Sequence, residues 1–301
     1  MAMVMRMNEH DFLAERFETH RGHLLAVAYR MLGSLTEADD ALQETWLKLS
    51  RSDPDEVDNL AGWLTTVVGR VCLDMLRSRR SRGEEPLDPQ VHVPDPIITG
   101  MGAGDPEESV LIADSIGLAL MVVLETLAPA ERLAFVLHDL FAVPFDEIAP
   151  IVDRTPAAAR QLASRARRRV QGAAPSPDVD LAVQREIVDA FLAAVRGGDF
   201  DALVAVLDPD VVARADGGPL RPGGSIVRGA ATVAGQALAF AQIADSARPA
   251  LVNGTAGVVA ISAGRPMSVL AFGFAARRIV SLDILADPAR LSRLDLTVPA
   301  S

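Results

Sequence analysis

The stretch from residue 129 to residue 171 constrains the fold most, because three helical patterns follow one another there with a sharp turn before the last. Apolar residues recur at helical spacing as far as Leu140, and a shorter apolar run covers residues 148–152. Thr155 is a favourable N-cap and Pro156 suits the first position of a helix. The helix that begins there is strongly basic. Such a pair of helices is typical of a helix-turn-helix that places its second helix in the DNA major groove.

Two features of this stretch depart from the common motif, and an alternative stays open. Asp153 occupies the turn where glycine is frequent, although aspartate tolerates a left-handed backbone better than most residues. Pro150 lies inside the first helix of the pair and predicts that this helix is short or kinked. The alternative interpretation is a solvated basic helix on an ordinary helical bundle.

Composition excludes several classes of protein. The 301 residues are half hydrophobic and carry a net charge of -11, so the chain is neither disordered nor a general coat for nucleic acid. The single cysteine, Cys72, fits a reducing compartment, and no Cys/His grouping has zinc spacing. We therefore expect no metal and no cofactor. No signal peptide or membrane-spanning run is evident, which predicts a soluble, cytoplasmic protein without a membrane partner.

Residues 11–82 form a helical block with two charged features. On the helix that ends at Leu49, one face is mostly acidic and carries a single apolar residue, Leu47. This face is either simply solvated or a docking surface for a basic partner helix. Asn59 can cap a further helix, which ends in a run of arginines suited to phosphate contacts.

Two linkers and a change of pattern follow. Residues 83–108 contain five prolines and seven acidic residues but no lysine or arginine, and residues 173–180 form a shorter linker. Beyond them we expect helices at 181–195, 200–207 and near 231–241. Short apolar runs at 211–212, 226–227, 258–263, 267–274 and 279–284 predict strands. Helices followed by a curved antiparallel sheet indicate an α+β domain.

The first two blocks together resemble a bacterial RNA polymerase sigma factor of the extracytoplasmic-function (ECF) type. The resemblance lies in motifs that keep the family's order and spacing: YRMLGS (29–34), EADDALQETWL (37–47), WL (63–64), RVCLDMLR (70–77), LAPAER (127–132), FDEIA (145–149) and AAARQ (157–161). It implies a multidomain chain with two all-α sigma domains, a sigma-2 helical bundle at 8–82 and a sigma-4 helix-turn-helix at 109–172. The linkers 83–108 and 173–180 would separate them from each other and from a third domain, 181–301.

The resemblance also implies partners and site residues. In the family the counterpart of the acidic face docks on the clamp helices of the polymerase beta-prime subunit, which assigns core-polymerase binding to Asp40, Gln43, Glu44 and Leu47. Sigma-4 has the beta flap as its partner. The basic helix end would open and recognise the minus-ten promoter element, and the last helix would recognise the minus-thirty-five element. The implied DNA-binding residues are Arg70, Arg77, Arg79, Arg80, Arg82, Thr155, Ala157, Ala158, Arg160, Gln161, Ser164, Arg165 and Arg168.

The third block resembles a SnoaL-like α+β cone of the nuclear-transport-factor-two (NTF2) type, as in the SigJ-like (ECF41-type) subgroup of sigma factors. The linker segment Val93, Pro94, Asp95, Pro96 is similar to a subgroup Leu-Pro-Glu-Pro segment. Asp216, Gly217 and Gly218 are similar to its Asp-Gly-Gly-Gly turn, with Pro219 in place of the third glycine. The resemblance implies that both segments are regulatory and that the domain modulates promoter activity in cis.

Two other functions compete with this interpretation. An enzyme is disfavoured, because residues 181–301 contain no His, Tyr, Cys, Lys or Trp and leave Asp216 and Asp283 as the candidate groups. A stand-alone ligand-responsive helix-turn-helix regulator is the main rival, and it would have no use for the acidic face. A small-ligand pocket in the third domain is also left open. Its candidate lining residues are Phe191, Phe240, Phe272 and Phe274, for which core packing is the alternative.

Overall fold

The fold consists of two compact units. The structure, a computed structural model, describes residues 2–52, 59–82, 91–99, 117–173, 179–218 and 225–294, with backbone alone at 2–12, 172, 173, 242 and 243. The helical unit comprises Met1–Glu85 and Leu127–Gly172. The sheet unit comprises Pro86–Thr126 and Ala173–Ser301. Within the described ranges, no helix is long and apolar enough to cross a membrane.

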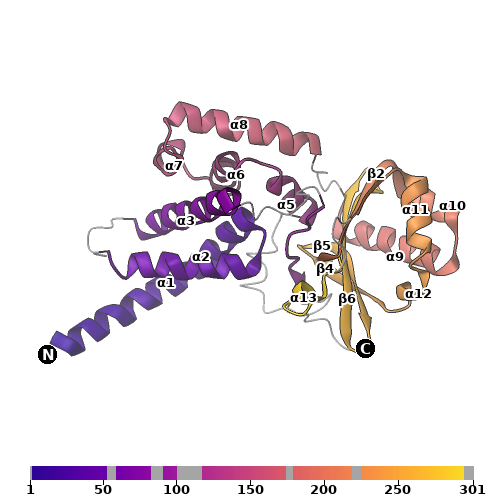
Figure 1. The fold of residues 1–301 in the computed structure, drawn as a ribbon, viewed down its shortest axis with the longest axis horizontal. Helices are drawn as coiled ribbons and strands as arrows, with labels where there is room; N and C mark the ends of the chain where they lie inside the picture. The colour runs from indigo at the N-terminus through magenta and orange to yellow at the C-terminus, as the bar shows by residue number, and fades with distance from the viewer. Residues whose placement is uncertain are drawn as a thin grey trace. The chain divides into compact units, whose positions relative to one another are not determined.

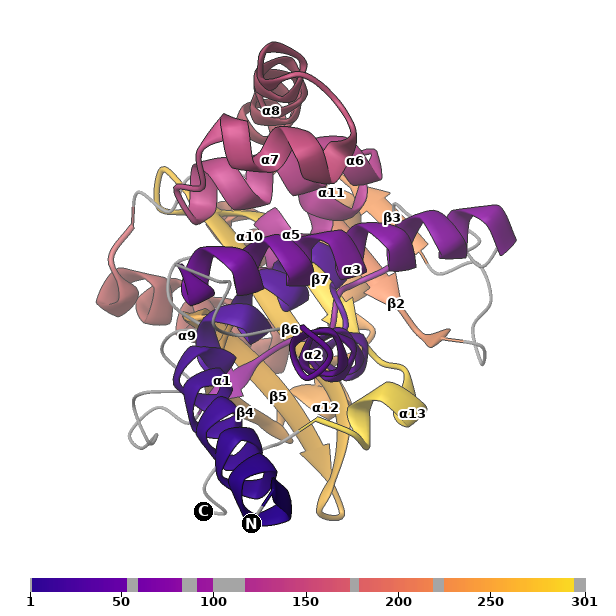
Figure 2. The same cartoon turned by 90° about the vertical axis from the view of Figure 1, so that its left-hand side faces the viewer.

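The helical unit brings residues from both ends of its sequence into one core (Figures 1 and 2). Its elements are α1 (Ala2–Leu32), α2 (Leu35–Leu49), α3 (Leu60–Arg82), α6 (Pro129–Phe135), the π-helical turn η2 (Val136–Leu140), α7 (Phe145–Val152) and α8 (Pro156–Ala173). The first three helices pack on one another, and α3 also contacts α6 and α7. Gly69 permits this approach, because a Cβ there would already lie 3.2 Å from a methyl group of Leu137.

The local signals in the helical unit act as expected. The side chain of Asn59 accepts a hydrogen bond from the backbone N–H of Gly62 at 3.1 Å and thereby caps α3. Asp153 ends α7 in the left-handed conformation, at φ 58° and ψ 52°. Thr155 Oγ1 accepts from the N–H of Ala158 at 3.3 Å and starts α8. Helix α7 continues through Pro150 for two more residues and is short, as the proline predicted.

The sheet unit is built on one seven-stranded sheet. Its strands are β1 (Ile98–Thr99), β2 (Leu207–Asp216), β3 (Ser225–Arg228), β4 (Ala247–Val252), β5 (Thr255–Ser262), β6 (Arg265–Ala275) and β7 (Arg278–Leu285). They lie in the order β1-β4-β5-β6-β7-β2-β3. All neighbours are antiparallel except β2 and β7, whose parallel pairing joins the first long strand to the last.

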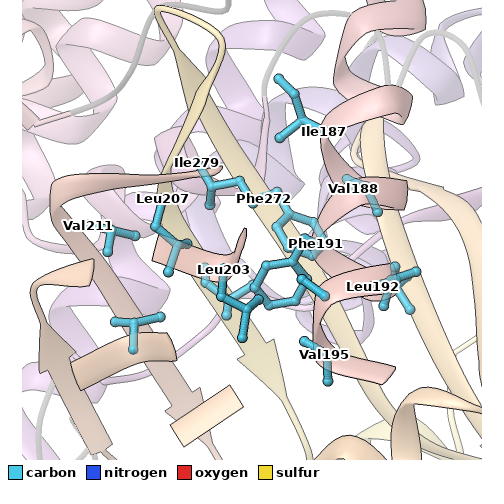
Figure 3. Packing of buried hydrophobic residues seen from close by; sticks show 14 of the residues in the cluster. Ile187, Val188, Phe191, Leu192, Val195, Leu203, Leu207, Val211, Phe272 and Ile279 are labelled. Atoms are coloured by element: carbon cyan, nitrogen blue, oxygen red, sulfur yellow. The ribbon is translucent and has the colours of Figure 1, made fainter. Parts of the chain in front are cut away.

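Helices cover the two faces of this sheet unequally. On one face lie α9 (Leu181–Gly197), α10 (Phe200–Val206), α11 (Ala230–Leu238) and α12 (Ala241–Ala244), and they enclose the main core (Figures 1 and 3). In that core Phe191 of α9 meets Phe272 of β6 edge to face, with ring centroids 5.5 Å apart. On the other face α5 (Leu118–Glu125) contacts β6 and β7. The short helix α13 (Pro288–Leu291) follows β7.

The structure differs from the sequence-based expectation in two places. Strands β1 and β4 were not predicted, so the helix near residues 231–241 precedes four strands and not three. Helix α5 also packs with the sheet unit, although residues 109–172 were assigned by sequence to one helix-turn-helix domain. The two compact units therefore differ from the domains expected from the sequence. That division stays a proposal about functional domains, with bounds at 8–82, 83–108, 109–172, 173–180 and 181–301.

Candidate nucleic-acid interface

The acidic face of α2 is exposed to solvent within the helical unit. Ala38, Ala41 and Leu42 bury the opposite side of the helix. Asp40, Gln43 and Glu44 are exposed, and Leu47 is 44% exposed, one of four large apolar side chains in the described residues that remain so open. An apolar residue among exposed carboxylates is suited to a basic partner surface with an apolar centre.

The basic end of α3 is only partly available. Arg77, Arg80 and Arg82 are exposed, whereas Arg79 forms an ion pair with Glu37 of α2. Arg70 is exposed and donates a long 3.4 Å hydrogen bond to the carbonyl of Pro150 in α7. The α3 residues assigned to DNA therefore include one, Arg79, that is held within the protein.

Cys72 lies on the buried side of α3. Burial raises the pKa of its thiol to about 12, against a smaller opposing effect of Arg132. A thiol of this kind stays protonated and unreactive at neutral pH, so Cys72 is a packing residue.

Helix α8 separates a small buried face from a polar exposed one. Ala159, Ala163 and Ala166 are completely buried, and their small side chains let α8 lie close to the rest of the unit. The exposed face carries Ala157, Arg160, Gln161, Ser164 and Arg168, with Thr155 at its start; Ala158 is half-buried. The guanidinium of Arg160 lies 5.2 Å from the centre of the Phe145 ring, which orients it near the start of the helix.

Other arginines of α8 are engaged by acidic residues of the same unit. Arg165 and Arg169 donate to the two oxygens of Glu131, at 2.7 and 3.2 Å. Arg167 forms an ion pair with Asp139. Glu131 is only 7% exposed, so Arg165 and Arg169 compensate the charge of a buried carboxylate. Arg165 was assigned to DNA from the sequence, but here it pairs with Glu131 of the same unit. Pairing of this kind is what the alternative interpretation, a basic helix on an ordinary helical bundle, predicts.

The linker segment 91–97 is bound by the sheet unit through a cluster that we call the linker clasp: Asp216, Asn253 and Arg290. Arg290 donates to Asp95 from Nε at 2.9 Å and from Nη2 at 2.6 Å, and Nη2 also donates to the carbonyl of Val93 at 2.6 Å. Its Nη1 reaches Asp216 at 2.8 Å. One arginine thus joins the two segments that the sequence marked as regulatory.

The other two members of the linker clasp hold the linker backbone. Asp216 accepts from the N–H of Val93 at 3.1 Å. Asn253 accepts from the N–H of Ile97 at 3.0 Å and donates its own N–H to the carbonyl of Ile97 at 2.8 Å. Strand β1 then continues this pairing along β4. Val93 and Asn253 are almost completely buried, so residues 91–99 form an integral part of the sheet unit.

Asp216 is ionised by this environment. Burial by itself raises the pKa of its carboxyl, but hydrogen bonds from His92 and from the N–H groups of Val93 and Gly218, together with the charge of Arg290, outweigh it and lower the pKa to about 2. His92 Nδ1 lies 3.1 Å from the carboxylate. A permanently charged Asp216 is suited to holding a cationic partner and is a poor proton carrier near neutral pH.

The turn after Asp216 requires glycine. Gly218 has φ 61°, and a Cβ there would collide with the carboxylate of Asp287. Gly217 and Gly218 therefore lie next to the linker clasp, and the N–H of Gly218 donates to Asp216 at 3.1 Å. Pro219 lies outside the described residues.

Sequence reasoning missed Arg290, Asn253 and His92. Arg290 is separated from Asp95 by 195 residues, and neither lies in a periodic pattern that would connect them. The one local signal is Asp287-Pro288, in which Asp287 caps α13 by accepting from the N–H of Ala289 at 2.9 Å. It predicts the helix that carries Arg290 but says nothing of the residue that Arg290 binds.

Asp283 forms a second, separate buried pair. Arg214 of β2 donates to it at 3.0 Å across the parallel pairing with β7. Burial raises the pKa of Asp283, and the nearby Arg214 partly opposes this. In the described part of the chain no group of three or more His, Cys, Asp or Glu side chains could hold a metal ion.

Comparison with known proteins agrees with this arrangement of helical and strand-rich parts. Residues 16–82 match the model of Sigma-70 region 2, and residues 117–170 match that of Sigma-70, region 4. The ECF RNA polymerase sigma factor SigJ of Mycobacterium tuberculosis is 43% identical over 258 residues, which are 83% of this chain and 81% of that one. The same organism's "Probable ECF RNA polymerase sigma factor SigI" is 34% identical over 96% of this chain and 98% of its own.

The likeness extends to the whole fold. The crystal structure of M. tuberculosis SigJ superimposes with a TM-score of 0.76 at 35% identity, over 94% of this chain and all of that one. The chain is a sigma factor, a protein that binds RNA polymerase and initiates transcription. It belongs to the ECF sigma factors. The expected order of helical sigma domains followed by a strand-rich α+β domain is confirmed, and the family excludes the stand-alone regulator.

Proposed function

We propose that this sigma factor is regulated in cis by the linker clasp, in addition to recruiting core polymerase to a promoter with two elements. The observation that carries the proposal is the bridge from Arg290 to both Asp95 and Asp216. It makes residues 91–99 part of the sheet unit, although they connect the two sigma regions in sequence. A change that weakens the linker clasp lets residues 91–99 move away from the sheet unit. Because these residues connect the two sigma regions in sequence, promoter activity changes with it.

We also propose particular contacts with polymerase and DNA. The exposed face with Asp40, Gln43, Glu44 and Leu47 binds the beta-prime clamp helices, and the region-4 part binds the beta flap. Exposed side chains at the end of α3 and the start of α8 bind the minus-ten and minus-thirty-five elements. Their solvent exposure and local charge support this assignment. Among the arginines, Arg160 and Arg168 on α8 are better candidates than Arg165, which is bound to Glu131.

The NTF2-like domain is proposed to have no catalytic activity, no metal and no cofactor, and the protein to act in the cytoplasm. The state of both candidate carboxylates supports the absence of catalysis. Asp216 is held ionised by hydrogen bonds from His92 and from the N–H groups of Val93 and Gly218, together with Arg290, and Asp283 is buried against Arg214. Neither is free to exchange a proton with a substrate.

In vitro transcription with purified core polymerase on a selected promoter tests the polymerase contacts. Gln43→Arg/Glu44→Arg should abolish transcription by placing positive charge on the proposed docking face. Glu15→Arg/Glu18→Arg, a charge reversal at exposed sites on α1, is the matched control and should leave transcription unchanged. Equal activity of the two double variants would refute the docking face.

The same assay tests regulation. Arg290→Gln in the full chain, and a chain ending at Gln171, should each change transcription at least about threefold relative to the wild type, in a direction that the assay will establish. Arg277→Gln, which removes an exposed pair with Glu186, serves as control. If the amides of residues 91–97 exchange faster in Arg290→Gln but its transcription is unchanged, the linker clasp is purely structural.

A further inference from the structure

The sheet unit contains a cavity of about 630 Å³ beside its core. Its walls come from α9, α11, α12 and the turn before it, the start of α13, and strands β2 to β7. Phe191, Leu192 and Val195, which follow one another along α9 (Figure 3), are among the residues that line it. Cavities of this size accommodate small organic molecules.

Apolar side chains face this space without filling it. Leu270 and Ile284 lie on interior strands of the sheet, where full burial is usual, yet both remain half-exposed and both line the cavity. Phe240 and Met267, at the edge of the cavity, are each 49% exposed. Of the four phenylalanines considered from sequence, Phe191 and Phe240 thus line the cavity, while Phe272 and Phe274 belong to the buried core.

The lining indicates what kind of molecule fits. Arg214 is the one charged residue among the lining residues in the described part of the chain, and its guanidinium pairs with Asp283. Ala213 and Leu282 of the same two strands belong to the core on the helix-covered face, so their neighbours Arg214 and Asp283 point to the opposite face. Ser225, Gln236 and Ser268 remain as polar side chains. An ionised ligand would be desolvated here without a counter-charge.

The cavity also shares structure with the linker clasp. Ala215 and Gly217 line it on either side of Asp216, and Ala286 and Pro288 line it on either side of Asp287. The carbonyl of Asp216 accepts from the N–H of Ala286 at 2.7 Å, which ties these two strand ends together. A molecule in the cavity therefore touches the backbone that positions Asp216, and α13 with Arg290 begins at the same wall.

We propose that this cavity is an effector site for an uncharged, mainly apolar small molecule with one or two hydrogen-bonding atoms, and that its occupancy changes the hold of the linker clasp on residues 91–97. The second half of this inference rests on the regulation proposed above, whereas binding itself does not. Because coupling is reciprocal, a molecule that loosens the linker clasp binds more tightly when the linker clasp is weakened, and one that tightens it binds less tightly.

Binding is tested on the full-length protein with N-phenyl-1-naphthylamine, a neutral probe whose fluorescence increases in apolar surroundings. Saturable binding of one probe per chain is expected. Ala239→Trp, at an exposed position on the cavity edge, should weaken binding at least about tenfold. Ala231→Trp, at an exposed position of α11 outside the lining, is the matched control and should bind as the wild type does.

A pair of competitors tests the ligand class. 1-Naphthol should displace the probe at least about tenfold more effectively than 1-naphthoate at pH 7, because the carboxylate would be buried without a partner. Non-saturable binding, equal binding by the two tryptophan variants, or equal competition by naphthoate would each overturn the proposed site. Thermal unfolding of each variant establishes that it is folded.

Coupling is tested by hydrogen exchange of the Val93 and Ile97 amides with and without N-phenyl-1-naphthylamine. We expect at least about a threefold change of exchange rate in the wild type and none in Ala239→Trp. If the probe binds saturably but the amide exchange rates do not change, the cavity is a binding site and the coupling to the linker clasp is refuted. Failure of the regulation proposed above gives a different result, namely that Arg290→Gln leaves transcription unchanged.

Discussion

The arginines of α8 and Arg290 of α13 use the same chemical group in opposite ways. In the ion pairs of α8 with Glu131 and Asp139, the arginine side chains are 42–58% exposed. Arg290 is 19% exposed and lies between two carboxylates that are 13% and 14% exposed. An ion pair with an exposed guanidinium is weakened by water and salt, whereas a pair with a largely buried guanidinium is screened much less. The pairs of α8 with Glu131 and Asp139 are therefore expected to be weaker than the hold of Arg290 on Asp95 and Asp216.

Removing Arg290 should have the largest effect, because it leaves two partly buried carboxylates without a cation. Arg290→Gln is expected to destabilise the sheet unit by about 3 kcal/mol. Arg277→Gln should change stability by less than about 0.5 kcal/mol, since its pair with Glu186 is exposed. Urea unfolding followed by circular dichroism measures both. Similar effects of the two variants would remove the distinction between buried and exposed arginines.

The turn beside the linker clasp gives the next largest effect. Gly218→Ala is expected to cost about 2 kcal/mol, because alanine at φ 61° is strained and its methyl group collides with Asp287. Gly235→Ala is the control with the opposite sign. It lies in α11 with nothing within 4 Å of a Cβ, so alanine should stabilise the helix by about 0.5–1 kcal/mol. Thermal unfolding of both variants measures these changes in stability. If Gly218→Ala leaves the stability unchanged, the turn is not rigid.

Two arginines of α8 sharpen the comparison within the helical unit. Arg160→Ala should weaken binding to minus-thirty-five DNA about tenfold and reduce the salt dependence by about one counterion. Arg165→Ala should affect DNA less and stability more, because it removes one of two cations that compensate Glu131. DNA binding by the holoenzyme at several salt concentrations, with thermal unfolding of the free protein, separates the two outcomes. The reverse order would assign Arg165 to the DNA.

The two buried aspartates should give stability effects with opposite dependence on pH. The pKa of Asp216 in the folded protein, about 2, lies below its ordinary value of 3.8. Its stabilising contribution is therefore complete above pH 3.8 and is lost as the pH falls through about 2. The pKa of Asp283 is raised, so the fold loses stability as the pH rises from 3.8 through that raised value.

Substitution by asparagine separates these two contributions. Asp216→Asn should remove the first pH dependence and lower stability at pH 7. Asp283→Asn should remove the second and raise stability at pH 7, because the neutral side chain avoids the desolvation of a carboxylate. Calorimetry between pH 2 and pH 8 measures both. A destabilising Asp283→Asn would mean that the pair with Arg214 contributes more than burial costs.

Much of the helical unit could be predicted from sequence because its signals are local. Asn59 and Thr155 cap helices within three residues, and Asp153 adopts the left-handed turn at its own position. The apolar stripe of α2 likewise predicts which side of the helix remains exposed. Strand β4 escaped prediction because Pro249 interrupts its pattern and its pairing depends on β5 and β1.

The sequence by itself determined the family, most of the helices and the exposed acidic face of α2, because these depend on motifs and on neighbours a few positions apart. Only the tertiary structure decided that Arg165 is bound to Glu131, that α5 packs on the sheet, and that Arg290 holds Asp95 from 195 residues away. The physical reason is that burial changes what a charged side chain does. Whether an arginine is buried is decided by the segments that pack around it.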